Sequence, residues 1–180
     1  MLAHPPVGHL ARQRFSIREL HASEDRACRI FFSHLNVEDI RMRFGCVHFS
    51  IRYLLPGQPG SGGGVAFAAV DAADQVLGIA NLAYLTPSVA EIAHVVRSDY
   101  KRHGRGHTLL AYAINWAEGE ALSEVVGYVL ADNRPMLSLA HKMGLHMVRR
   151  DGLEVEIRAC IVSRCDKRTT HQTSYLLSVN

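Results

Sequence analysis

Two glycines one residue apart, Gly104 and Gly106, stand within a cluster of Lys, Arg and His, directly before a helix-like run. An apolar, strand-like segment, Val89 to Arg97, precedes them. Glycine lets a backbone approach a ligand with no Cβ atom in the way. The first N–H groups of a helix lack internal partners and carry partial positive charge. The stretch therefore predicts a strand–turn–helix unit that binds an anion such as a pyrophosphate, with a basic, solvent-exposed turn as the alternative.

Other glycine-containing motifs do not fit this stretch. A Walker loop requires G-x-x-x-x-G-K-S/T, which the sequence lacks. A dinucleotide-binding loop requires G-x-G-x-x-G, and Leu109 stands where its third glycine would be. Nucleic-acid binding would require basic residues interleaved with aromatic ones over a longer surface. The formal net charge of the chain is only +3, so we expect no nucleic-acid partner.

Hydrophobic periodicity alternates strands with helices along the chain. We expect strands at Phe15–Leu20, 65–71, 76–85, Val89–Arg97, Glu124–Leu130 and Leu153–Val162. We expect helices that begin at Ser23, Asn36, the glycine turn and Asn133, with Gly144 ending the last one. The apolar side of the third helix consists of Leu109, Leu110, Ala113, Ile114 and Ala117. The last strand alternates, which places Leu153, Val155 and Ile157 on its buried side. This order predicts one α/β layered domain with a mixed sheet.

The length of 180 residues suits a single domain. We expect a flexible N-terminal arm at residues 1–13 and the folded domain at residues 14–164. Residues 165–180 are polar, and we expect them to form a C-terminal tail. The sequence contains neither an apolar run of roughly 20 residues nor a signal-peptide core, so we expect a cytoplasmic protein without a membrane partner. The four cysteines form no C-x-x-C pair, and we expect no bound metal.

Three separated motifs resemble those of the GNAT acetyltransferase superfamily. Its acyl-CoA-binding motif, Gln/Arg-x-x-Gly-x-Gly/Ala, stands here as Lys101-Arg102-His103-Gly104-Arg105-Gly106, with Lys in the first position. The segments "AEIAHVVRSDY" and "NRPMLSLAHKMGL" match in order and spacing. Asn36-Val37-Glu38-Asp39 and Arg43-Phe44 are similar to the GNAT domain of bacterial Pat-type protein lysine acetyltransferases. The resemblance implies the GNAT fold: a mixed, mostly antiparallel sheet with a splayed central strand pair, flanked by helices on both faces.

The same resemblance implies acetyl-CoA as co-substrate and indicates which residues bind it. The end of the strand before the turn would pair with the pantetheine arm, the turn would hold the pyrophosphate, and the next helix would begin beside the pantetheine arm. The implied coenzyme-binding residues are His94, Val95, Val96, Lys101, Arg102, His103, Gly104, Arg105, Gly106, His107 and Asn133. The backbone N–H of Val96 would also polarise the thioester carbonyl.

Acetyl transfer to an amine requires a neutral nucleophile, whereas a lysine side chain with a pKa of ~10.4 is almost wholly protonated at pH 7. Glu91, with Ala90 and Ile92 on either side, can accept that proton. The resemblance to Pat-type enzymes assigns the role of general base to Glu91. We therefore expect acetyl transfer to a primary amine, with a protein lysine favoured, by direct attack in a ternary complex.

Two alternative functions stay open. The acceptor could be a small-molecule amine or an amino acid, because no motif constrains the acceptor side. The domain could instead sense acyl-CoA without catalysis, because Ala140 stands where many relatives place a Tyr that protonates the departing thiolate, and Lys101 departs from the motif. A homodimer is also left open.

Overall fold

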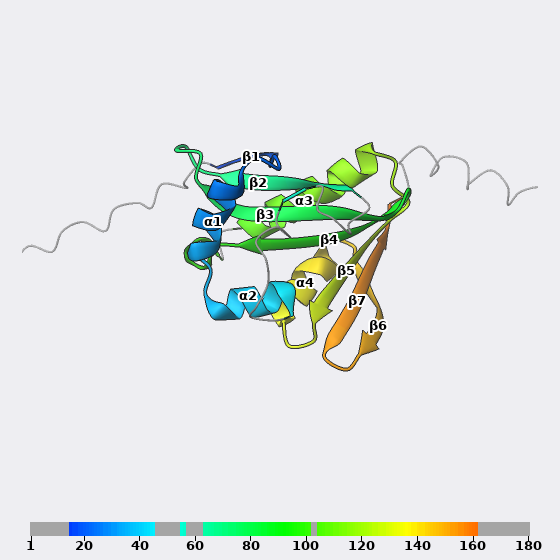
Figure 1. Ribbon diagram of the computed structural model, residues 1–180. Helices are drawn as coiled ribbons and strands as arrows, with labels where there is room; N and C mark the ends of the chain where they lie inside the picture. The colour runs from blue at the N-terminus through cyan, green and yellow to red at the C-terminus, as the bar shows by residue number, and fades with distance from the viewer. Residues whose placement is uncertain (1–14, 46–54, 57–62, 102–103, 162–180) are drawn as a thin grey trace, which may run out of the picture.

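The computed structural model describes residues 15–45, 55–56, 63–101 and 104–161. Within them, seven strands form one sheet in the order β1-β2-β3-β4-β5-β7-β6 (Figure 1). The strands are β1 (Ser16–Glu19), β2 (Gly64–Val70), β3 (Val76–Thr86), β4 (Val89–Val96), β5 (Glu124–Leu130), β6 (His146–Asp151) and β7 (Glu154–Cys160). Only β4 and β5 pair in parallel; the other neighbours are antiparallel. The expected N-terminal arm and C-terminal tail lie outside the described residues.

Helices cover both faces of the sheet (Figure 1). The first pair, α1 (Asp25–Ser33) and α2 (Val37–Phe44), packs on one face, and α3 (Arg105–Gly119) and α4 (Arg134–Lys142) pack on the other. A 3-10 helix, η2 (Ser98–Tyr100), leads from β4 toward α3. None of the described helices combines the length and the apolar character needed to span a membrane.

The sheet separates two apolar cores, and β2 contributes to both of them. Val65, Phe67 and Ala69 pack into the core beneath α3 and α4. Ala66, Ala68 and Val70 pack into the core beneath α1 and α2. Successive side chains of a strand point to opposite faces, so a strand buried on both faces reads as a continuous apolar run. This arrangement confirms the expected mixed, mostly antiparallel sheet with helices on both faces.

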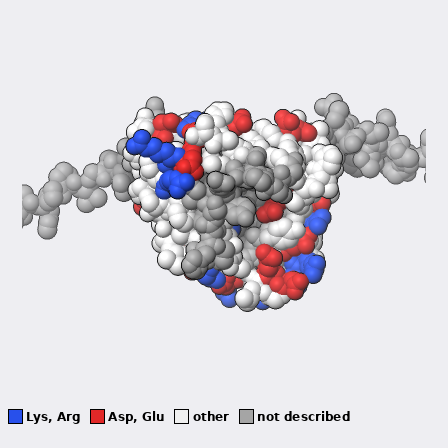
Figure 2. Space-filling model, in the orientation of Figure 1, with Lys and Arg blue, Asp and Glu red and all other residues white. Residues whose placement is uncertain are grey.

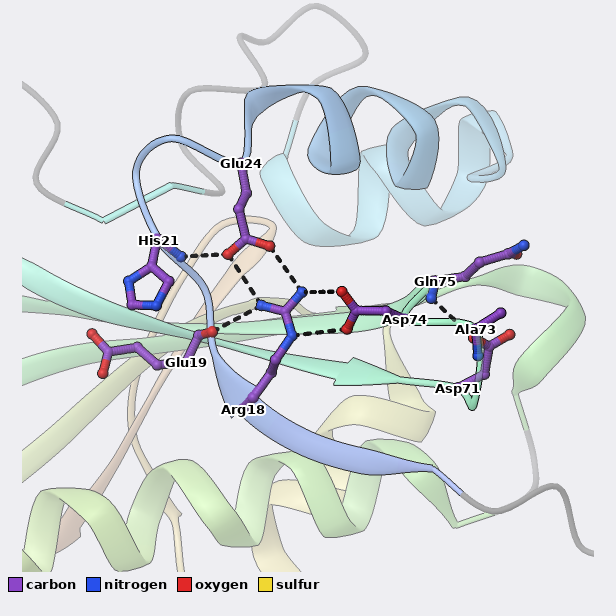
Figure 3. Close-up of polar contacts among 8 residues, drawn as sticks. All are labelled: Arg18, Glu19, His21, Glu24, Asp71, Ala73, Asp74 and Gln75. Atoms are coloured by element: carbon purple, nitrogen blue, oxygen red, sulfur yellow. Dashed lines mark hydrogen bonds and ion pairs between the residues drawn. The ribbon is translucent and has the colours of Figure 1, made fainter.

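An ion-pair network around Arg18 fixes the entry into α1 (Figure 3). Arg18 Nη2 donates to Glu24 Oε1 at 2.8 Å, and its Nε donates to Asp74 Oδ1, in the β2–β3 turn, at 3.0 Å. The other carboxylate oxygen of Glu24 accepts from the backbone N–H of His21 at 2.8 Å. Glu24 is therefore the residue that precedes α1, and the expectation that Ser23 caps this helix is wrong. No side chain of the described residues caps α1, and the Glu24 carboxylate instead accepts from Arg18 and from the N–H of His21, which lies before the helix.

The other expected helix boundaries agree with the structure. Asn36 Oδ1 accepts from the backbone N–H of Asp39 at 2.7 Å, and Asn133 Oδ1 accepts from that of Met136 at 3.2 Å. Both side chains satisfy one of the N–H groups that a helix start leaves free. Gly144, shortly after the end of α4, has a φ of +83°, a left-handed conformation that favours glycine.

The edge strand β6 is missing from the sequence-based order of elements. All of its residues are exposed, so it shows no alternation from which a strand could be recognised. The expectation that Leu153 lies on the buried side of the last strand is also wrong, because Leu153 lies in the β6–β7 turn and is 80% exposed. Val155 and Ile157 are buried as expected.

Leucine-to-alanine substitutions at Leu109 and Leu153 test this assignment of the core. Leu109 is fully buried between α3 and the sheet, so we expect Leu109→Ala to lower the free energy of unfolding by about 3 kcal/mol. Leu153→Ala removes the same atoms from an exposed turn, and we expect a change within about 0.5 kcal/mol. Chemical denaturation followed by circular dichroism measures both, and similar losses would contradict the assignment.

Candidate active site

The central strands β4 and β5 pair over a short distance and then separate (Figure 1). The paired residues are Val89 with Glu124, Ala90 with Val125, and Glu91 with Val126. A Cβ atom added at Gly127, just after the last pair, would lie 3.1 Å from Ile157 Cγ1 on β7 and 3.3 Å from the carbonyl oxygen of Ile92, so glycine allows the close packing of these strands. Beyond the last pair the register does not continue among the described residues, and a gap opens between β4 and β5.

The edge of β4 that borders this gap carries backbone groups of His94 and Val96. Arg97 donates its N–H to the carbonyl oxygen of Leu77 on β3 at 2.9 Å, in register with the rest of β4. Hydrogen-bonded and non-hydrogen-bonded residues alternate along an antiparallel pair, so the N–H of Val96 faces away from β3. The backbone groups of His94 face the gap in the same way, whereas those of Val95 face β3. Two of the three backbone positions expected at the pantetheine arm therefore border the gap.

The first turn of α3 lies at the far end of β4. Gly104 precedes α3 with a φ of +77°, and no side chain of the described residues caps the helix. The N–H groups of Arg105, Gly106 and His107 come too early in α3 to have an intrahelical acceptor. A Cβ atom added at Gly106 would lie 3.4 Å from His94 Nε2, whereas one at Gly104 would meet no atom within 4 Å. The turn thus combines free N–H groups with close backbone approach, as a pyrophosphate site requires.

Helix α2 bridges the two strands on the far side of the gap. The Asp39 side chain is only 4% exposed, and its carboxylate accepts hydrogen bonds from Lys101 Nζ and the Ser98 hydroxyl, both of which follow β4. Arg41 pairs with Asp132, which follows β5, at 2.8 Å. Lys101, expected to donate to the coenzyme, thus contacts a carboxylate of α2. Sequence reasoning missed this role of Asp39.

The basic residues of the turn differ in how far their side chains are exposed to solvent. Arg105 is buried: its Nη1 donates to the carbonyl oxygen of Tyr100 at 3.2 Å, and its guanidinium lies 4.8 Å from the Tyr100 ring centroid. Arg105 therefore offers a ligand its backbone N–H. His107 is exposed, and Arg102 and His103 lie outside the described residues.

Glu91 lies at the point where β4 and β5 separate, half-buried on the sheet face that α1 and α2 cover. Burial raises the pKa of the Glu91 carboxyl above its usual range. The charge of Arg43 on α2 lowers this pKa, and the charge of Glu154 on β7 raises it. A half-buried carboxyl with a raised pKa is suited to accept a proton from an amine.

Arg43 and Asn81 lie on the same side of the sheet as Glu91. Arg43 Nη2 donates to Asn81 Oδ1 at 3.4 Å, and the guanidinium lies 4.8 Å from the ring centroid of Phe44. Burial lowers the pKa of Arg43 to about 10, although Glu91 opposes this shift. Sequence reasoning missed Asn81, and the signal that could have found it is an amide within the apolar run "VLGIANLAYL".

His94 and Asn133 lie toward the opposite face, beneath α3 and α4. The His94 imidazole approaches Gly106, and burial lowers its pKa to about 4, with the charges of Arg43 and Lys101 acting in the same direction. Asn133 is half-buried and caps α4, which begins beyond the end of β5. Ala140 is fully buried and has no group that could protonate a leaving thiolate.

A shallow cleft lies over β5, β7 and β6, where charged side chains gather at the lower right of Figure 2. It is lined by Tyr128, Arg149, Asp151, Glu154 and Glu156. Two of its three carboxylates are in ion pairs: Asp151 with Arg149 at 2.9 Å and Glu156 with Arg158 at 2.5 Å. Because Glu154 acts on the pKa of Glu91, the cleft places negative charge near that residue.

No group of three or more His, Cys, Asp or Glu side chains that could bind a metal occurs in the described part of the chain. Cys28 is buried and Cys160 is exposed, and both are free thiols. Cys46 and Cys165 lie outside the described residues.

Comparison with known proteins agrees with this geometry. Residues 21–145 match the Acetyltransferase (GNAT) family. This match covers more than half of the 180 residues, so the chain belongs to the GNAT acetyltransferase family. The protein is accordingly an acyltransferase of a family that uses acetyl-CoA.

Solved structures share the fold at low sequence identity. The GNAT domain of PAT from S. lividans has a TM-score of 0.70 at 15% identity, covering 80% of this chain and 89% of that chain. Spermidine N-acetyltransferase from Vibrio cholerae, in complex with CoA and spermine, has a TM-score of 0.62 at 14% identity, covering 80% and 92%. The ribosomal-protein-S18-alanine N-acetyltransferase from Escherichia coli has a TM-score of 0.62 at 17% identity, covering 82% and 94%. These likenesses confirm the expected GNAT fold.

Alanine substitutions at Gly104 and Gly106 compare two ways in which a side chain can destabilise the turn: an unfavourable backbone conformation and a steric contact. Gly104 has a left-handed φ, so we expect Gly104→Ala to lower the free energy of unfolding by about 1–2 kcal/mol. Gly106 lies outside the left-handed region, and its added Cβ would meet His94 at contact distance, so we expect a smaller loss. Chemical denaturation measures both, and a larger loss at Gly106 would contradict this description of the turn.

Proposed function

We propose that the protein transfers an acetyl group from acetyl-CoA to a primary amine in a ternary complex, with Glu91 as general base. The observation that carries this proposal is the position of Glu91. It lies at the point where β4 and β5 separate, its pKa is raised by burial, and the free backbone edge of β4 begins beside it. A base at that point is next to any thioester held along the edge.

The residues that would hold the coenzyme fit an anionic group joined to an amide-containing arm. The free N–H groups in the first turn of α3 suit the pyrophosphate. The backbone groups of His94 and Val96 that border the gap suit the amides of the pantetheine arm. Asn133, at the start of α4 on the other side of the gap, completes the proposed set.

The proposed step follows from the charge state of the amine. Glu91 takes a proton from the acceptor ammonium, and the neutral nitrogen forms a bond to the acetyl carbon as the C–S bond breaks. The second proton that the nitrogen loses as the amide forms passes to the departing thiolate, which leaves as CoA thiol. The N–H of Val96 is the proposed donor to the oxygen on which negative charge develops. The thiolate needs no dedicated acid, because a thiol pKa of ~8.5 makes it a fair leaving group near neutral pH.

A protein lysine is the acceptor that we favour. The Pat-type resemblance of Asn36-Val37-Glu38-Asp39 and Arg43-Phe44 supports it. The Glu154 carboxylate, which lines the cleft of β5, β7 and β6 and acts on Glu91, suits a cationic segment there. Incubation with acetyl-CoA and bacterial proteins or pooled small amines, with mass detection, would identify the acceptor.

Glu91→Gln tests the role of the base. We expect turnover to fall by about 100-fold or more, because the amine loses its proton acceptor, while the Kd for acetyl-CoA stays unchanged. The folded state raises the pKa of Glu91, so its charged form opposes folding at pH 7, and we expect the variant to be at least as stable as the wild type. Steady-state kinetics, calorimetry and thermal unfolding measure the three quantities.

Two results would count against this role. Normal turnover by Glu91→Gln would remove Glu91 as base. Acetyl-CoA binding by the wild type with no CoA release across the whole amine and protein panel would favour the acyl-CoA-sensing alternative.

The pH dependence of kcat/KM also tests Glu91 as the base, because the charge of Glu154 acts on the pKa of Glu91. Activity requires ionised Glu91, so it should fall as the pH decreases through the pKa of this group. The charge of Glu154 raises that pKa, and we expect Glu154→Gln to move the acidic limb to lower pH and, because the cleft loses a carboxylate, to raise the KM for a cationic acceptor. If the acidic limb of the kcat/KM profile stays at the same pH in Glu154→Gln, a group other than Glu91 controls it.

A further inference from the structure

The His94 side chain lies between two parts of the proposed coenzyme site. His94 projects from β4 to the face covered by α3 and α4, where a Cβ atom added at Gly106 would lie 3.4 Å from its Nε2. The same point lies 3.7 Å from Val96 Cγ2 and 3.9 Å from Leu139 Cδ2 on α4. The imidazole therefore lies against the first turn of α3 and beside the gap that β4 borders.

The ring nitrogens of His94 lack hydrogen-bond partners in the described part of the chain. Nδ1 is enclosed and has no partner, which costs about 1–3 kcal/mol for a buried polar group. Nε2, the nitrogen near Gly106, is not enclosed in this way. Burial together with the charges of Arg43 and Lys101 lowers the pKa of His94 to about 4, so the imidazole is neutral at pH 7.

A neutral imidazole has one N–H and one lone pair. A proton on Nδ1 would be an enclosed donor without an acceptor, whereas a proton on Nε2 can meet a molecule in the site. The geometry therefore favours the tautomer with the proton on Nε2. A buried polar atom without a partner is uncommon in folded proteins and calls for an explanation, and a functional role is one of them.

We infer that the Nε2–H of neutral His94 donates a hydrogen bond to an amide carbonyl oxygen in the pantetheine arm of bound acetyl-CoA, an inference that rests on the proposed function. The backbone groups of His94 and Val96 already face the gap, so one residue contacts the arm with both its backbone and its side chain. A carbonyl of the arm is the proposed partner because the backbone groups of the same residue border the gap where the arm would lie, and a neutral imidazole can donate to it. The contact acts on binding, so it should affect KM more than kcat.

Substitution of His94 by Leu and by Gln tests the hydrogen bond. Leu removes both nitrogens, and we expect acetyl-CoA to bind about tenfold more weakly, with a similar rise in its KM and little change in kcat. Gln places an N–H near the position of Nε2, and we expect it to retain most of the affinity. Isothermal calorimetry with acetyl-CoA and steady-state kinetics measure these effects.

The stability of the free protein distinguishes this role from a merely structural one. His94→Leu removes a buried nitrogen without a partner, so the variant should be as stable as the wild type or more stable while it binds acetyl-CoA more weakly. Calorimetry in two buffers of different ionisation enthalpy should show no proton uptake that depends on His94. Such uptake, present in the wild type and absent in His94→Gln, would overturn the neutral donor and indicate a phosphate partner.

The remaining outcomes separate this inference from the proposed function. Equal affinity of the wild type and His94→Leu for acetyl-CoA would overturn the inference alone. Loss of stability in free His94→Leu that matches the loss of affinity would assign His94 a structural role and overturn it as well. No measurable acetyl-CoA binding by the wild type would overturn both.

Discussion

The end of the β4–β5 pairing is the constraint on which the site depends. Three residue pairs hold the strands together, and the last of them contains Glu91. Beyond it, backbone donors and acceptors of β4 lie inside a sheet without a neighbouring strand, an arrangement that buried backbone rarely tolerates unless another molecule supplies the hydrogen bonds. The sheet thus has an internal edge, and the proposed base, the free edge and the first turn of α3 follow one another along β4 and the turn after it.

The electrostatics of Glu91 arise from elements distant in the sequence. Arg43 comes from α2 and Glu154 from β7, and they act on the carboxyl in opposite directions. Burial is the largest effect and favours the neutral form. The charges of Arg43 and Glu154 therefore adjust the pKa of Glu91, whose main shift comes from burial at this position on β4. The charges that act on Glu91 come from both ends of the described domain, which explains why no short motif describes them.

The parts of the fold that depend on residues close together in the sequence could be predicted from it. Asn36 and Asn133 cap their helices within three residues, and the apolar stripe of α3 follows the helical period. The exposed strand β6 has no periodic signal, and the Lys101–Asp39 contact joins residues 62 positions apart. Resemblance of separated motifs predicted the GNAT fold and family. The roles of Glu91 and of the coenzyme-binding residues stay predictions, because they depend on molecules that bind between the elements.

The two contacts of α2 across the gap differ in strength. The Asp39 carboxylate is 4% exposed and also accepts a hydrogen bond from the Ser98 hydroxyl, although Lys101 is 46% exposed. In the other pair both side chains are exposed, Arg41 to 35% and Asp132 to 61%. Dissolved ions screen an exposed pair far more than a buried one. Rising ionic strength should therefore loosen the attachment of α2 to the β5 half first and leave the helix fixed to the β4 half. At high salt, the Asp39 contacts would then be the ones that keep α2 attached to the segment following β4, the strand that contains Glu91.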